Sequence, residues 1–319
     1  MKYIIYSVLA LALTAGLAFG ITGLIRKRLK KKPPLFLHCI ISLLLMTVIS
    51  AGTAAVYVSI HYPADEDALN TFSGAGAPAL RETEGAYFID GPGEDTALVF
   101  YPGAKVDPEA YFPLMKKIAE KGIDCFVVRP PFRLAIFDPD AAGRIIDKYK
   151  YQRWIVSGHS MGGVCAASFA AGDPDRTDGV VLLAAYPGSQ MDKSIRLLSI
   201  YGSEDMVLDR DQYNNSRSLF PPDYREIVIK GGNHSGFGNY GEQRGDGTAL
   251  ISRKKQQEQT AEAIAGSFLK TPGKTIILPG KDSSCFSRKF KNHLWSEGHK
   301  WFFYKNLQMN KRVNVKAGF

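Results

Sequence analysis

The chain has 319 residues, of which 45% are apolar and 22% are charged, and this composition excludes a disordered or a collagen-like protein. Its four cysteines show no CxxC or Cys/His spacing, so we expect no metal site, thioredoxin-type motif or disulfide scaffold. The net charge of +9 comes from the two ends, because residues 62–270 carry −6, and this acidic middle argues against a nucleic-acid partner.

Two long apolar runs come first in the chain. Tyr3–Ile25 holds 23 uncharged residues and Leu35–Ile60 holds 26, and each exceeds the roughly 20 residues that a helix needs to cross a bilayer. Between them, residues 26–34 carry six positive charges and no acid. A short basic loop between two spans is typically cytoplasmic. Residues 1–61 therefore predict a two-helix transmembrane hairpin with membrane lipid as its partner.

This orientation places the N-terminus and everything after Ile60 outside the cytoplasm. An alternative for the first run is a cleaved signal peptide, because Gly16–Ala18 offers small residues at a cleavage spacing. The positive charges directly after the run fit a stop-transfer end better. In either case the second run anchors the chain, so we expect an integral protein of the cell membrane with an extracytoplasmic catalytic domain.

The globular part begins after an expected linker over residues 62–85. From residue 86 to 270, short β-branched or aromatic runs alternate with turns and helical segments, which predicts an α/β domain with a doubly wound, mostly parallel sheet. The expected strands are Ala86–Asp90, Thr96–Tyr101, Asp124–Val128, Trp154–Ser157, Gly179–Ala184, Arg196–Tyr201 and Arg225–Ile229. The expected helices are Asp107–Lys121, Pro139–Tyr149, Met161–Ala171, Leu208–Ser218 and Lys254–Leu269.

The strongest chemical signal is a G-x-S-x-G pattern in Gly158–Gly163, which reads GHSMGG. It lies between an expected strand that ends at Ser157 and an expected helix of small residues that begins at Met161. A strand–turn–helix with this pattern is typical of a nucleophile elbow, in which a strained turn raises the serine hydroxyl above the sheet. We therefore predict that Ser160 is a catalytic nucleophile, against the alternative of an ordinary glycine-rich turn.

A serine hydroxyl needs a base to accept its proton, and in this architecture the chain order is serine, acid, histidine. Four residues, GSED, follow the strand that ends at Tyr201, and we select Asp205 as the acid. Glu204 and Asp209 are its rivals. His234 lies in a glycine-rich loop after the next strand and is the only histidine between the acid and the last expected helix, so it is the predicted base.

These three side chains predict acyl transfer through an acyl-enzyme. His234 accepts the Ser160 proton and returns it to the leaving group, while Asp205 orients the imidazole and stabilises its charged form. The negative charge on the substrate carbonyl oxygen needs backbone N–H donors, an arrangement called an oxyanion hole. We expect these donors from Met161, directly after the nucleophile, and from Ala104, in the turn after an earlier strand.

Several segments resemble α/β-hydrolase family 5, serine hydrolases related to dienelactone hydrolases within the α/β-hydrolase superfamily. The similar segments are the elbow, FYPGAKVDPEAY at Phe100–Tyr111, RPPFRLA at Arg129–Ala135, DGVVLLAAYP at Asp178–Pro187, Gly231–Gly241 and Gln243–Gly247. The resemblance covers about residues 86 to 260. It implies an α/β-hydrolase fold and a Ser160–Asp205–His234 hydrolase without metal or organic cofactor, often anchored in a membrane.

Two positions depart from the pattern of that family. Ala104 stands where glycine is frequent, which should be harmless if only its N–H is used. Arg133 stands where asparagine is frequent, and we expect it to alter the rim of the pocket. The resemblance therefore implies a reaction type but no particular metabolite.

The predicted function is hydrolysis of a small-molecule carboxylic ester or lactone. A near alternative is an acyltransferase with the same three residues, in which an alcohol replaces water as the acceptor. A third reading, from another class, is a non-catalytic envelope binding protein that has kept the fold. The first two differ in water access and acceptor binding, for which the sequence carries no signal.

The resemblance stops before residues 271–319, a tail that carries +8 and includes Trp295 and the run Trp301–Tyr304. We expect a poorly ordered extension. The alternative is an interfacial segment that contacts anionic lipid or wall polymer.

Overall fold

The computed structural model describes residues 2–29, 34–74 and 78–269, which separate into one unit of helices before Ile60 and a second unit that begins there. The expected tail over 271–319 lies outside the described residues, as do residues 30–33 of the expected basic loop. In the first unit, α1 (Lys2–Arg28) and α2 (Leu35–Ser59) contact each other, and Thr22 Oγ1 lies 2.7 Å from Ser42 Oγ. Among the described residues, only α2 is long and apolar enough to cross a membrane.

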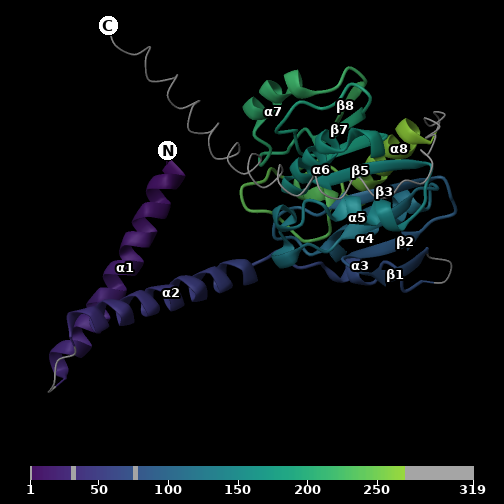
Figure 1. Cartoon of the computed structure of the whole chain (residues 1–319). Coiled ribbons are helices and arrows are strands. Elements are labelled where there is room, and N and C mark those ends of the chain that lie inside the picture. Colours follow the sequence, from purple (N-terminus) through teal and green to yellow (C-terminus); the bar gives the residue numbers. More distant parts are fainter. Residues whose placement is uncertain (1, 30–33, 75–77, 270–319) are drawn as a thin grey trace, which may run out of the picture. The chain divides into compact units, whose positions relative to one another are not determined.

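The second unit is built around a single sheet with the strand order β1-β2-β4-β3-β5-β6-β7-β8 (Figure 1). β2 runs antiparallel to β1 and β4, and every pair from β4 to β8 is parallel. The strands are β1 (Ala79–Thr83), β2 (Ala86–Asp90), β3 (Thr96–Tyr101), β4 (Asp124–Val128), β5 (Arg153–His159), β6 (Gly179–Leu183), β7 (Arg196–Gly202) and β8 (Tyr224–Ile229).

Helices cover both faces of this sheet, which is why its central strands are buried and mostly apolar. In β3, Leu98 and Phe100 pack on the face of α4 (Phe112–Ala119) and α8 (Arg253–Phe268). The alternate residues Ala97 and Val99 pack on the other face, against α5 (Ala141–Lys148) and α6 (Met161–Gly172). A further helix, α7 (Arg210–Ser216), adds the buried Tyr213 to that second face. The doubly wound, mostly parallel sheet predicted from the sequence is confirmed.

The described residues of the expected linker, 62–74 and 78–85, instead contribute to the second unit. They include the short helix α3 (Glu66–Leu69) and the edge strand β1. The side chains of β1 are exposed or half-buried, so this strand has no apolar pattern that the sequence could reveal. Just before α3, the N–H of Tyr62 donates to Lys105 O at 2.7 Å, which ties the entry of the domain to the turn after β3.

Candidate active site

Ser160 occupies a sharp turn between β5 and α6. Its φ of +54° lies in a region that residues other than glycine rarely adopt, so the turn is strained. The turn is held because the Ser160 N–H donates to Leu183 O on β6 at 2.9 Å and Ser160 O accepts the N–H of Gly163 at 3.0 Å. The residue is half-buried, and its hydroxyl has no hydrogen-bond partner among the described residues. This is the geometry that the G-x-S-x-G pattern predicts.

The elbow packs directly on the end of β3. This close contact is possible because Gly162 has no side chain. A Cβ atom at Gly162 would lie 2.2 Å from Tyr101 O and 2.3 Å from Pro102 O, distances that require the backbone to move.

We expect Gly162→Ala to lower the free energy of unfolding by about 3 kcal/mol, measured by chemical denaturation. Gly172→Ala at the other end of α6 is the matched control, because nothing lies within 4 Å of its Cβ. An equal loss in both variants would contradict the packing described here.

Asp205 and His234 follow the carboxyl ends of β7 and β8 and meet there. His234 Nδ1 lies 2.9 Å from Asp205 Oδ2, and both side chains are fully buried. Asp205 Oδ1 accepts the N–H groups of Val207 at 2.9 Å and Leu208 at 2.8 Å, which fixes the carboxylate. A neutral His234 that donates from Nδ1 to this carboxylate keeps an acceptor lone pair on Nε2. That Nε2 atom is buried and has no partner among the described residues.

The structure brings neither rival acid to His234. Glu204 accepts the Ser203 hydroxyl at the surface, at 2.7 Å. Asp209 is the N-cap of α7 and accepts the N–H of Gln212 at 3.0 Å. Of the three acids weighed from the sequence, only Asp205 contacts the imidazole.

The loop after β8 carries His234 across the sheet towards the elbow. The His234 ring lies 4.5 Å from the ring of His159, the residue directly before Ser160. Ser160 Oγ and His234 Nε2 make no hydrogen bond in this state, and such catalytic bonds often tighten only once substrate is bound. All three predicted catalytic side chains are therefore at the same edge of the sheet.

Two residues that sequence reasoning missed hold this loop. Asp246 accepts the backbone N–H of His234 at 3.2 Å and that of Ser235 at 2.8 Å. Gln256 on α8 pairs with the Asn233 backbone in both directions, at 3.1 and 2.8 Å. Asp246 belongs to a segment quoted above for the resemblance, but no local pattern shows that its carboxylate closes the loop around the histidine.

The two expected oxyanion donors lie on neighbouring strand ends. Tyr101 pairs with Gly158 in the β3–β5 register, so the turn that follows β3 lies beside the elbow. Among the described residues, the N–H groups of Ala104 and Met161 have no acceptor, and both residues are at least partly exposed. The Gly103 N–H, by contrast, donates to Tyr111 Oη at 3.1 Å. Ala104, not Gly103, is thus the residue of this turn with a free donor.

The model of the alpha/beta hydrolase family matches residues 97–258, which is half of the chain. The chain belongs to the alpha/beta hydrolase family. Membership indicates a hydrolase, and the matched range includes the elbow, the acid and the histidine. A comparison with curated proteins finds no match.

Several solved structures of hydrolases are similar to this family member. A CIB-like hydrolase from Thermoplasma acidophilum is 16% identical, with 59% of this chain and 99% of that chain covered and a TM-score of 0.44. Est1E from Butyrivibrio proteoclasticus is 14% identical over 61% of this chain and 98% of its own, with a TM-score of 0.43. Epoxide hydrolase A from Mycobacterium thermoresistibile is 9% identical over 61% and 99%, with a TM-score of 0.49.

Arg133 lies beside the turn after β3 of this hydrolase. Its φ is +58°, in the left-handed region that residues other than glycine and asparagine rarely adopt. The Arg133 guanidinium pairs with Asp107, and Arg133 O accepts the Lys105 N–H at 2.8 Å. Arg133 therefore supplies an ion pair next to the turn that carries Ala104.

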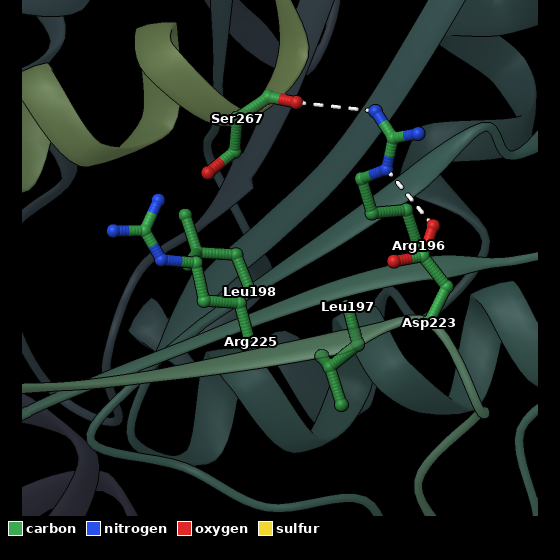
Figure 2. A pocket seen from close by; sticks show the side chains of 6 residues that line it. All are labelled: Arg196, Leu197, Leu198, Asp223, Arg225 and Ser267. Carbon is green, nitrogen blue, oxygen red and sulfur yellow. Dashed lines mark hydrogen bonds and ion pairs between the residues drawn. The ribbon is translucent and has the colours of Figure 1, made fainter. Parts of the chain in front are cut away.

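A pocket of about 260 Å³ lies at the opposite edge of the sheet of this hydrolase, where β7 and β8 begin (Figure 2). It is lined by Arg196, Leu197, Leu198, Asp223, Arg225 and Ser267. Arg196 pairs with Asp223 at 3.1 Å and donates to Ser267 O at 3.1 Å, so it links the end of α8 to the start of β7. Asp205 and His234 follow the other ends of the same strands, which makes this pocket separate from the candidate active site.

Proposed function

We propose that this hydrolase cleaves a small carboxylic ester or lactone through an acyl-enzyme formed on Ser160, with His234 as the base. The observation that carries the proposal is the His234 imidazole. Its Nδ1 is held by the Asp205 carboxylate at 2.9 Å, while its Nε2 is buried, has no partner in the described part of the chain and can accept a proton. The ring lies beside the residue that precedes a strained serine. A base in this arrangement serves nucleophilic attack by a hydroxyl.

The reaction follows from these positions. His234 Nε2 takes the Ser160 proton as Oγ attacks the substrate carbonyl, and Asp205 stabilises the imidazolium that forms. The N–H groups of Ala104 and Met161 donate to the carbonyl oxygen as it becomes negative. The tetrahedral intermediate expels the leaving alkoxide, which receives the proton from His234. Water, deprotonated by the same imidazole, then attacks the acyl carbonyl. The acid is released as the bond to Ser160 Oγ breaks, and His234 returns the proton to that oxygen. No metal or organic cofactor enters any step.

A panel of p-nitrophenyl esters and lactones, assayed with the full chain in detergent, tests this function. We expect ester or lactone turnover with release of the free acid. Addition of an alcohol acceptor distinguishes the alternative, because an acyltransferase would form a new ester in preference to the acid. Absence of turnover on every ester and lactone, from protein that is folded, would contradict the proposal.

We also propose that residues 1–61 form a transmembrane hairpin that anchors the catalytic domain outside the cytoplasm. The apolar side chains of α2 are largely exposed, as for a helix surrounded by lipid. Ala18, Thr22 and Ser42 are buried where α1 contacts α2, and small and polar residues are typical of such helix contacts in membranes. Arg26–Arg28 end α1 with three positive charges, which favours a cytoplasmic loop.

Protease treatment of intact cells or spheroplasts checks this topology. We expect a tag placed in the basic loop to be protected and the region 62–270 to be digested from outside. Lysed cells, in which both are digested, are the control. Protection of region 62–270 in intact cells would reverse the orientation.

A further inference from the structure

A buried tyrosine links the turn after β3 to the nucleophile elbow. Tyr111 lies just before α4 and is completely buried. Its Oη accepts the Gly103 N–H at 3.1 Å and lies 2.8 Å from His159 Nδ1. One hydroxyl thus joins the residue before Ala104 to the residue before Ser160.

The direction of these hydrogen bonds follows from the charge states. Burial, together with the neighbouring His234, holds the pKa of His159 well below its usual range, so this imidazole is neutral. Burial raises the pKa of Tyr111, so its hydroxyl keeps its proton. Tyr111 Oη then donates to His159 Nδ1 while it accepts from Gly103. The other tautomer would make Oη accept both bonds and leave the tyrosine proton without an acceptor.

The three groups are in close contact. A Cβ atom at Gly103 would lie 2.9 Å from Tyr111 Oη and 2.9 Å from His159 Nδ1, so the turn rests directly on both polar atoms. His159 in turn lies 4.5 Å, ring to ring, from His234. Any displacement of the Tyr111 hydroxyl therefore shifts the turn after β3 that carries Ala104, the nucleophile elbow and the His234 imidazole.

We propose that Tyr111, acting through His159, is a positioning residue that sets the Ala104 donor against Ser160 and Met161. The inference rests on the proposed function, because it concerns the same reaction. Donors of an oxyanion hole act only when they are aimed at the place where the oxyanion will form, and small misplacements are costly. Neither ring is exposed to substrate, so Tyr111 and His159 position the reacting groups without touching the substrate.

Tyr111→Phe removes the linking hydroxyl and keeps the ring. We expect kcat on a p-nitrophenyl ester to fall about 10- to 100-fold, with KM changed by less than about two-fold, because positioning affects the transition state more than binding. Tyr213→Phe is the matched control. Tyr213 is as buried, and its hydroxyl contacts Ser199 Oγ at 2.7 Å and Glu226 Oε2 at 3.0 Å, neither of which is a predicted site residue. The control should leave kcat within about two-fold of the wild type.

If Tyr111→Phe is folded and its kcat is no lower than that of Tyr213→Phe, the inference is wrong. If Tyr111→Phe does not fold, His159→Asn and His159→Leu decide the matter. Asparagine places an amide oxygen near the position of Nδ1 and can accept the tyrosine proton, whereas leucine cannot. We expect His159→Asn to retain at least ten times the kcat of His159→Leu, a rescue that loss of packing alone would not produce. Equal kcat in the two variants would overturn the inference.

Labelling by a fluorophosphonate separates this inference from the proposed function. A wild type that reacts at Ser160, together with a Tyr111→Phe variant that reacts equally fast, contradicts the inference alone. A folded wild type that does not react contradicts the proposed function and the inference with it. Slower labelling of Tyr111→Phe than of Tyr213→Phe supports both.

Discussion

Ser160→Ala is expected to lower kcat for ester hydrolysis by about 10⁶-fold, the size of loss found when the nucleophile of a serine hydrolase is removed. The reason is that the proposed acyl-enzyme forms on the Ser160 hydroxyl. Cys165, the next nucleophile along α6, is buried, and its burial raises the pKa of the thiol to about 12, which leaves it protonated and inert. Steady-state kinetics on the best p-nitrophenyl ester measures the loss.

The fold should survive this change. The Ser160 hydroxyl has no partner among the described residues, and alanine is as small, so the free energy of unfolding should change by less than about 0.5 kcal/mol. Ser168→Ala on the exposed face of α6 is the control and should keep full activity. If the Ser160→Ala variant kept more than a hundredth of the wild-type kcat, the assignment of Ser160 as the nucleophile would be wrong.

Asp205→Asn is expected to lower kcat by about 10⁴-fold, because it gives His234 the wrong tautomer. The N–H groups of Val207 and Leu208 both donate to Asp205 Oδ1, so an asparagine must keep its oxygen there. Its NH₂ group would then face His234 Nδ1, which would have to become an acceptor. The proton would move to Nε2, and that nitrogen could no longer accept the proton of Ser160.

Asp209→Asn is the matched control for this second change. It makes the same substitution four residues later, at a side chain that caps α7 and does not contact His234. Asparagine is as good an N-cap as aspartate, so both activity and stability should stay near the wild type. A loss of activity for Asp209→Asn equal to that for Asp205→Asn would show that the acid has been assigned to the wrong residue.

The strand ends explain why the candidate site could be predicted from the sequence. In a parallel sheet the carboxyl ends of the strands lie at one edge, so Ser160 after β5, Asp205 after β7 and His234 after β8 must gather there. The apolar runs of β5 and β7 are visible in the sequence because both faces of the sheet are covered there, whereas β8 is a partly exposed edge strand. The main helices were predicted from the segments between these strands, and their observed ends differ from the expected ends by a few residues.

The supporting contacts could not be predicted. β1 is an exposed edge strand, and its sequence lacks the alternation that marks a half-buried strand. In the sequence, Tyr111 is one aromatic residue of an expected helix. Its hydroxyl contacts His159 only because the fold brings together two residues that are 48 positions apart. Asp246 reads as a surface acid in a glycine-rich loop, although it fixes the backbone of His234. Such contacts depend on tertiary packing, which has no local signature.

The most direct measurement is the reaction of the full chain with a fluorophosphonate, followed by intact-mass and peptide analysis. The account predicts one adduct per chain, located on Ser160, and a rate of labelling that falls at least a hundred-fold in His234→Ala. An adduct at another residue, or a rate on Ser160 that does not depend on His234, would contradict the claim that this imidazole activates that hydroxyl.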